Sequence, residues 1–499
     1  MNDKVLYKLS LVVLLSFTLL SCATRAQSIE ASTSSQTELS MQNKSINELP
    51  IPELAASKVF QYGMPQRFRT DNGISVWYVH NPMVPMMTVR ATFPVGGAHD
   101  GEGKAGLAHF CMSMLKEGAN GMNAQELSDA IEEIGASLYT SAAQDNSAME
   151  LQVMTEYFAE GLKLYADIWE HADFRVDAYE RLAKIRATNL TRRGENPEVV
   201  SKVAGNRDFF GENSPYALPA DGLISSLPHI SLDDIKAIYR RILFNKDVVI
   251  TGAGNIEGEE FMLMLNQAIG HIELNEITEA IDFSPDKTRA LSFNIVDKPG
   301  AAQSVIRIIL PAPRSDAPQS IDLRFLNIPF GGSFTGRLMQ NIREDKGYSY
   351  GAYSVVAALK HDGLFVATAS VASEVTGAAL SEFLYELERL KQGDFSQDEL
   401  DRAKATWQAE LVQNFETQSG IVSMFSSLQS NRQEPELFND YTAKFLKLEL
   451  NEFNTWAREL TKLENASITI VGDKNSILEQ TKDLPLPAPV FRNTEGDVL

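Results

Sequence analysis

The stretch that decides the fold runs from Gly106 to Leu115 and reads Gly-Leu-Ala-His-Phe-Cys-Met-Ser-Met-Leu. Apolar residues are dense in it and no proline interrupts it, so we expect a helix from about Leu107 to Lys116. On such a helix His109, Met112 and Ser113 share one face, because residues three and four apart are neighbours on a helix surface.

This face has the spacing of a zinc site but lacks the ligands. A His-x-x-Glu-His helix gives zinc two imidazoles, and its Glu is the general base for the metal-bound water. Met112 stands where the base would be, and a thioether neither takes nor gives a proton. Ser113 stands where the second imidazole would be, and a neutral hydroxyl is a poor zinc ligand. We therefore expect a structural role for His109, with a metal ligand as the alternative, and a buried apolar thiol at Cys111.

A longer stretch, from Gly96 to Phe110, resembles the segment that leads into the inverted zinc motif of the pitrilysin or insulinase family of metallopeptidases, which includes the mitochondrial processing peptidases. That family places a third ligand, a Glu, roughly 76 residues beyond the second His. This position is Asn189 here, in a stretch from Phe174 to Pro197 that is similar to the family's. The resemblance implies that every part of the motif except His109 has been replaced, so that this chain holds no zinc and is inactive alone.

A second stretch, from Gly331 to Gly351, is also specific. Its glycines do not form a phosphate loop, because the Lys-Ser/Thr of a Walker motif is absent. It resembles the family's second-domain segment, in which an Arg and a Tyr seven residues later reach towards the zinc; the matching residues are Arg343 and Tyr350. Such donors bind a substrate carbonyl and stabilise the oxyanion that forms on it. The alternative is that Arg343 pairs with Glu344 and Tyr350 packs a strand, but the resemblance favours substrate binding.

The N-terminus predicts a lipoprotein. Two lysines precede an apolar run from Leu9 to Leu20, which is too short to span a bilayer and ends in Leu-Leu-Ser-Cys. These four residues resemble the bacterial lipobox, which implies a signal peptide at 1–21 and lipidation of Cys22; a plain cleaved signal is the alternative. Ala23 follows, which favours the outer membrane. Residues 22–54, rich in Ser, Thr, Gln and Asn in their first half, read as a flexible tether.

Composition limits the class of protein. The chain has 499 residues, 44% of them hydrophobic and 22% charged, which is typical of a globular protein of two or three domains. A net charge of -21 argues against a nucleic-acid partner, because such binding needs clustered Lys and Arg. If Cys22 is lipidated, only Cys111 is left as a thiol and no intramolecular disulfide forms.

Caps and alternation predict individual elements. We expect one helix to begin at Asn123, a second to cover Val176 to Thr191 and a third to begin at Ser231. Four apolar residues at helical spacing predict a further helix with a buried stripe, and alternating residues predict two half-buried strands. The stripe is Phe158, Leu162, Tyr165 and Trp169, and the strands are Thr88 to Phe93 and Met149 to Val153.

The second half of the chain repeats the first. Asp394-Phe395 lies 221 residues after Asp173-Phe174, and Arg402 lies 221 residues after Arg181. So long a repeat suggests two similar domains from a duplication. The resemblance implies an α+β fold with two homologous α/β-sandwich domains of about 220 residues, each a mostly antiparallel sheet packed by helices. We expect these domains at 55–275 and 289–490, with a linker at 276–288.

Together these features predict a function. A degenerate zinc site beside an intact Arg/Tyr pair resembles the non-catalytic half of the family's heterodimers, in which one subunit supplies zinc and the other the pair. The resemblance implies a lipid-anchored periplasmic subunit that binds peptide and completes the active site of a zinc-bearing partner. A lipid-anchored peptide-binding or scaffold lipoprotein is the alternative. A third reading, a peptidase that uses His109 with another base, needs ligands that the sequence does not show.

Overall fold

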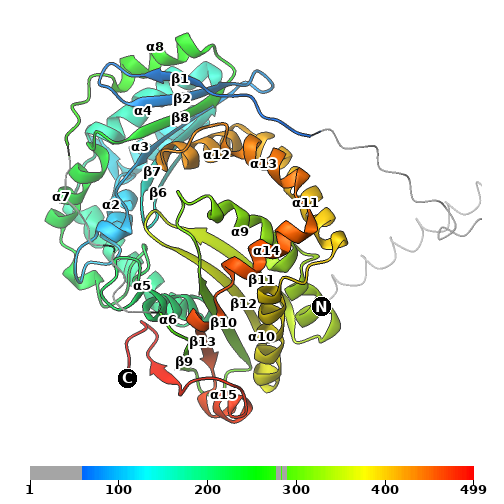
Figure 1. Ribbon diagram of the computed structural model, residues 1–499. Coiled ribbons are helices and arrows are strands. Elements are labelled where there is room, and N and C mark those ends of the chain that lie inside the picture. The colour runs from blue at the N-terminus through cyan, green and yellow to red at the C-terminus, as the bar shows by residue number, and fades with distance from the viewer. Residues whose placement is uncertain (1–58, 277–282, 284–288) are drawn as a thin grey trace, which may run out of the picture. The chain divides into compact units, whose positions relative to one another are not determined.

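The computed structural model describes residues 59–276, 283 and 289–499 (Figure 1). The predicted signal peptide, the lipidation site Cys22, the tether and most of the linker lie outside the described residues. Within the described ranges, no helix combines the length and the apolar character that crossing a membrane requires.

A six-stranded sheet forms the core of the first half. Its order is β1-β2-β8-β3-β7-β6, and every neighbouring pair is antiparallel except β2 and β8. The two predicted strands, β3 and β7, are confirmed and slightly longer than expected. They are not half-buried, however, because Thr88, Thr92 and Glu150 on their second face are buried too. The strands are β1 (Gln66–Arg69), β2 (Ser75–His80), β3 (Met86–Phe93), β6 (Ser137–Ala142), β7 (Ser147–Met154) and β8 (Val249–Gly254).

The described residues of the first half also form seven α-helices and a small hairpin. The predicted capping boxes at Asn123 and Ser231 are confirmed, and the predicted stripe on α4 is fully buried. The first helix ends at Met114, two residues before the predicted end. These elements are α2 (Leu107–Met114), β4 (Gly118–Ala119), β5 (Met122–Asn123), α3 (Ala124–Glu133), α4 (Phe158–Glu170), α5 (Val176–Gly194), α6 (Pro197–Phe210), α7 (Leu232–Leu243) and α8 (Gly258–Ile269).

The second half builds a second six-stranded sheet. Its order is β11-β12-β10-β13-β9-β14, with β13, β9 and β14 parallel and the other pairs antiparallel. Its elements are β9 (Ser292–Asp297), β10 (Gln303–Pro311), α9 (Gln319–Asn327), β11 (Ser349–Ala358), β12 (Gly363–Ala372), α10 (Thr376–Gln392), α11 (Gln397–Phe415), α12 (Gln418–Ser430), α13 (Leu437–Lys447), α14 (Leu450–Leu460), β13 (Ser467–Gly472), α15 (Lys474–Thr481) and β14 (Val490–Arg492).

The two sheets have the same topology. The order β2-β8-β3-β7-β6 in one matches β9-β13-β10-β12-β11 in the other, each starting with a parallel pair. Helices α5 and α11 both have 19 residues, and α11 begins 221 positions after α5, as the repeated sequence predicts. The predicted fold class, two helix-packed and mostly antiparallel sheets, is confirmed. The predicted domain boundaries stay a prediction.

Each half covers part of the other half's sheet. Helix α6 of the first half packs on β9, β10 and β13, and α12 of the second half packs on β2, β3 and β8 (Figure 1). On α12, Gln429 accepts a hydrogen bond from the Thr251 hydroxyl at 2.8 Å and donates to the Ser75 carbonyl at 3.1 Å. The exchange ties the halves together through two helices at equivalent places in the repeat.

The close packing of α6 on the second sheet depends on Gly205. A Cβ atom at this position would lie 3.1 Å from Ile309 and 3.4 Å from Thr469. We therefore expect Gly205→Leu to lower stability by about 1–3 kcal/mol through overpacking, despite the better helix propensity of Leu. Thermal unfolding of Gly205→Leu measures this loss. Gly194→Leu is the control, because a Cβ atom at Gly194 would meet nothing within 4 Å. Equal melting temperatures for the two variants would contradict the packing.

Candidate functional site

The start of α2 is fixed by a buried carboxylate. Asp100 accepts hydrogen bonds from the backbone N–H groups of Gly106, Leu107 and Ala108 at 2.7, 3.1 and 2.7 Å. Burial raises the pKa of Asp100 to about 7, and the three backbone donors oppose that rise. Gly106 has a left-handed φ of 93°, which favours glycine. This cap sets the position of His109 within the first turn of the helix.

His109 contacts an arginine instead of a metal. The guanidinium of Arg186 on α5 lies 2.8 Å from His109 Nδ1, and it also donates to the carbonyls of Gly106 at 3.1 Å and Asp221 at 2.6 Å. Because a guanidinium has no acceptor, Nδ1 must accept and the proton of the neutral ring sits on Nε2. Burial lowers the pKa of His109, and the charge of Arg186 lowers it further. Neither ring nitrogen then keeps a free lone pair for a metal.

The other positions of the degenerate motif lie apart from this contact. Met112 is 1% exposed and belongs to the core of the first sheet. The Ser113 hydroxyl donates to the His109 carbonyl within α2 at 2.8 Å. Asn189 is exposed. The residue of α5 that faces His109 is Arg186, which the sequence analysis missed; it precedes Asn189 by three residues, the spacing at which helix residues share a face.

The residues around His109 do not fit zinc. The described residues contain no group of three or more His, Cys, Asp or Glu side chains that could hold a metal ion. A guanidinium already occupies the one imidazole of the motif, and its positive charge opposes a cation there. Cys111 is fully buried, as predicted, and burial raises the pKa of its thiol. This thiol is therefore neither a ready ligand nor a nucleophile.

A cavity of about 490 Å³ opens beside His109. Its walls come from both halves: α2, the β6–β7 turn, α6 and the loop after it on one side, and β10, β11 and β12 on the other. Its polar lining residues are His109, Gln144, Lys202, Asn206, Tyr216, Asp221 and Arg307. The degenerate motif thus faces a space between the two sheets that is large enough for a short peptide segment.

Arg343 and Tyr350 lie elsewhere. Tyr350, at the start of β11, is 92% exposed, so it does not pack the strand as the alternative reading has it. The Arg343 Nε lies 3.3 Å from a Glu344 carboxylate oxygen, so the ion pair that the alternative predicts is present. The same guanidinium stacks 4.9 Å from the centre of the Phe334 ring. Ala357, which lines the cavity near His109, is seven residues along β11, or roughly 20 Å from Tyr350. The Arg/Tyr pair is presented on the surface, away from His109.

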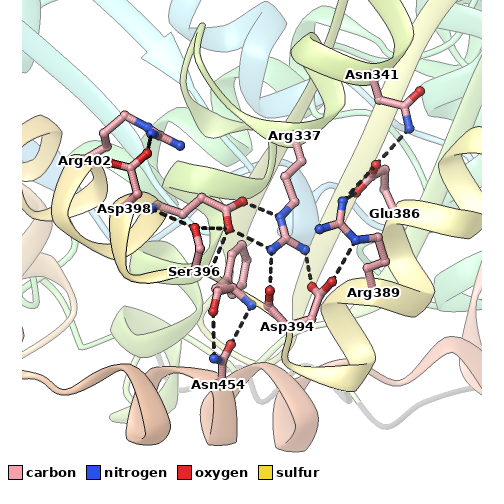
Figure 2. A network of polar contacts seen from close by, with 11 residues as sticks. Arg337, Asn341, Glu386, Arg389, Asp394, Ser396, Asp398, Arg402 and Asn454 are labelled. Atoms are coloured by element: carbon pink, nitrogen blue, oxygen red, sulfur yellow. Dashed lines mark hydrogen bonds and ion pairs between the residues drawn. The ribbon is translucent and has the colours of Figure 1, made fainter. Parts of the chain in front are cut away.

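A buried ionic network holds the segment that carries the pair (Figure 2). Arg337 donates to both carboxylate oxygens of Glu399, at 2.5 and 3.0 Å, and to the carbonyl of Asp394 at 3.1 Å. Asn341 donates to Glu386 at 2.8 Å. Arg337 and Glu386 side chains are 5% and 3% exposed. The network therefore fixes the helical turn Met339–Asp345, which includes Arg343, against α10 and α11.

Fold and site together define a two-domain metallopeptidase fold whose metal site lacks its ligands. Residues 75–203 match the family described as Insulinase (Peptidase family M16), and residues 229–406 match the Peptidase M16 inactive domain. The two matches together cover more than half of the chain. The chain belongs to the insulinase-like peptidase family M16, so the resemblance seen in the sequence is confirmed.

Similar proteins agree with a non-catalytic member of this family. A Helicobacter pylori protein described as the non-peptidase homolog YmxG is 23% identical over 407 residues, which cover 80% of this chain and 92% of that protein. The Bacillus subtilis YmxG, described as an uncharacterized zinc protease, is 22% identical over 80% of this chain and 96% of that protein. The crystal structure of a peptidase M16 inactive domain from Pseudomonas fluorescens shares the fold, with a TM-score of 0.77, 21% identity and coverage of 82% and 98%.

Removing the centre of the ionic network should destabilise the second half strongly. Arg337→Met leaves the buried side of Glu399 unpaired, which typically costs about 3–5 kcal/mol. Arg402→Met is the matched control, because its ion pair with Asp398 is half exposed and should be worth less than about 1 kcal/mol. Urea unfolding of both variants checks this; similar losses would show that the Arg337 network does not stabilise the fold.

The contact between Arg186 and His109 predicts a titration shift. In Arg186→Met the positive charge is gone, so the pKa of His109 should rise towards 6.5 while staying below it because the ring is still buried. NMR of a sample labelled at histidine follows the titration, with Arg181→Met on the same helix as control. An unchanged pKa of His109 in Arg186→Met would place the guanidinium away from the ring.

Proposed function

We propose that this chain is the non-catalytic, substrate-binding subunit of a heterodimeric zinc metallopeptidase. Its partner is a homologous subunit with an intact His-x-x-Glu-His motif, which supplies the zinc and the general base. This chain supplies the Arg343/Tyr350 pair and part of the surface on which the peptide lies. It is inactive alone, and the two subunits together hydrolyse peptides.

The observation that carries this proposal is the contrast between the two sites. At the first, Arg186 donates to the one imidazole of the motif, and the described residues contain no group of three or more metal-ligating side chains. At the second, Tyr350 on β11 is 92% exposed, and Arg343, which stacks on Phe334, belongs to a helical turn that a buried network holds. A large aromatic side chain so exposed contributes little to its own fold, and tyrosine and arginine are the residues that carry binding energy at interfaces.

Peptide binding is supported by the edges of both sheets. Strands β6 and β11 are edge strands, so one side of each backbone has free N–H and C=O groups. An extended peptide can add to such an edge through main-chain hydrogen bonds. Both strands also border the cavity beside His109, so a peptide on either edge would reach it.

The proposal includes a location. A signal peptide at 1–21 followed by lipidation of Cys22 would anchor the chain in the periplasm, and the Ala23 that follows favours the outer membrane. Two acyl signals give stable anchoring, and residues 22–54 would provide the reach to a membrane-bound or free partner.

A second candidate is a lipid-anchored peptide-binding or scaffold protein without a role in proteolysis. One observation favours it: Arg343 is already paired with Glu344 in the isolated chain, at 3.3 Å. Since both side chains are partly exposed, that pair is weak and a substrate or partner could replace it. Partner-dependent cleavage distinguishes the two functions, because only the peptidase subunit requires it.

The double variant Arg343→Ala, Tyr350→Phe should lose partner-dependent cleavage. Removing one donor of this kind typically lowers the rate by about 10²–10³, and the exposure of both side chains means that the fold and assembly should be unaffected. The measurement is hydrolysis of an unfolded protein by this chain co-purified with a zinc-motif homologue from the same source.

The control is Arg175→Ala with Tyr157→Phe, two exposed residues outside the segment, which should cleave as wild type does. Full cleavage by the Arg343/Tyr350 variant would refute the role of the pair. No cleavage by any combination of subunits would favour the scaffold.

A further inference from the structure

A guanidinium without a carboxylate partner lies at the wall of the cavity beside His109. Arg307 sits in the middle of β10, paired in register with Thr368 on β12 and Thr469 on β13. Its Nε is buried and has no hydrogen-bond partner. No ion pair to Arg307 occurs within the part of the chain that the structure describes, while the side chain lines the cavity.

Such an arrangement is costly for the fold. A partly buried cation without a counterion is unfavourable, and burial lowers the pKa of Arg307 to about 10, so it is still charged at neutral pH. Acidic residues are not scarce, since the chain has 66 Asp and Glu against 45 Lys and Arg. Arg337 and Arg492, which are more buried than Arg307, are each paired with a carboxylate, Glu399 and Asp208 respectively. A guanidinium kept unpaired is therefore available to a ligand that brings its own negative charge.

The rest of the cavity provides acceptors. The Gln144 amide nitrogen donates to the Leu218 carbonyl at 2.6 Å, and the buried oxygen of the same amide is without a partner. The side-chain oxygen of Asn206 is also buried and without a partner. Both residues line the same cavity as Arg307. Because both oxygens are shielded from solvent, their amides must turn towards the cavity before a ligand can give them N–H groups, while the anionic group of the ligand pairs with the guanidinium.

The charge of the lining is positive. Lys202 and Arg307 both border the cavity, and Asp221 is the one carboxylate among its lining residues in the described part of the chain. Asp221 is already ion-paired with Arg193. The cavity therefore attracts an anion although the chain as a whole is acidic, because interactions over a few ångströms exceed the screened field of distant charges.

We propose that this cavity binds the carboxylate of a peptide, with Arg307 holding the carboxylate and Gln144 and Asn206 accepting N–H groups of the adjacent residues. A planar carboxylate matches the fork of a guanidinium with two parallel hydrogen bonds. A phosphate would bring further oxygens against the two acceptors and has no N–H group to offer them. The carboxylate comes either from the C-terminus of the peptide or from an Asp or Glu side chain. This site rests on the proposed function, since it specifies which peptides the subunit prefers.

The test compares three peptides on the purified full-length chain without a partner. They are an N-acetylated decapeptide without charged side chains, its C-terminal amide, and the amide with one internal Glu. Calorimetry should show that the free acid binds at least tenfold more tightly than the amide. Arg307→Met should remove this preference, and Arg324→Met, whose guanidinium stacks on Trp407 and Phe438, should keep it.

Each outcome decides the proposal. Tight, Arg307-dependent binding of the Glu-containing amide would support it and identify a side-chain carboxylate as the source, whereas binding of the free acid alone would identify the C-terminus. Equal affinities for all three peptides, no binding of any peptide, or a preference for a carboxylate that survives in Arg307→Met would overturn it. The wild-type comparison needs no variant to fold. Because no partner is present, a failure of partner-dependent cleavage would leave this result unchanged.

Discussion

The exchange of one helix between the two halves is the packing constraint on which the rest of the structure depends. Helix α6 covers one face of the second sheet and α12 covers one face of the first, while each sheet packs its main core against helices of its own half. The same exchange brings Asn206 of α6 and Arg307 of β10 to one cavity. The cavity beside His109 therefore follows from how each half covers the free face of the other half's sheet.

Three arginines that are wholly or partly buried show that the neighbouring groups determine the role of a guanidinium in this acidic chain. Arg337 is surrounded by carboxylates and holds a segment in place. Arg186 donates to two carbonyls and to the ring of His109, so it fills a former metal position with hydrogen bonds. Arg307 has neither kind of partner. The first two arrangements satisfy the guanidinium within the chain, and only the third leaves its binding capacity for a ligand.

Much of the fold could be predicted from the sequence because its signals are local or repeated. Capping boxes at Asn123 and Ser231 mark helix starts through contacts over three residues, and the 221-residue repeat fixes the correspondence of α5 and α11. The contact of Arg186 with His109 could not be predicted in this way. It depends on how α5 is rotated against α2. Counting from the motif selects Asn189, which is exposed, whereas the residue that reaches His109 is Arg186, three positions earlier on the same helix.

The lack of a carboxylate partner for Arg307 is even harder to predict from the sequence. It depends on which side chains surround Arg307 at a place where several elements of the fold meet. No periodicity or spacing records that absence. Fold and family therefore follow from the sequence, while the ligand preference requires the packed structure.

The residues that stand at the ligand positions of the zinc motif have structural roles, and in this they differ from Tyr350. Met112 adds to the core and Ser113 bonds within its helix, so each replacement now contributes to stability. Reversing them would place a carboxylate in an apolar core and cost several kcal/mol. Tyr350 has no such role, since it is almost fully exposed. The hydrogen bonds around His109 therefore oppose a metal there, whereas the exposed side chain of Tyr350 contributes little to the fold.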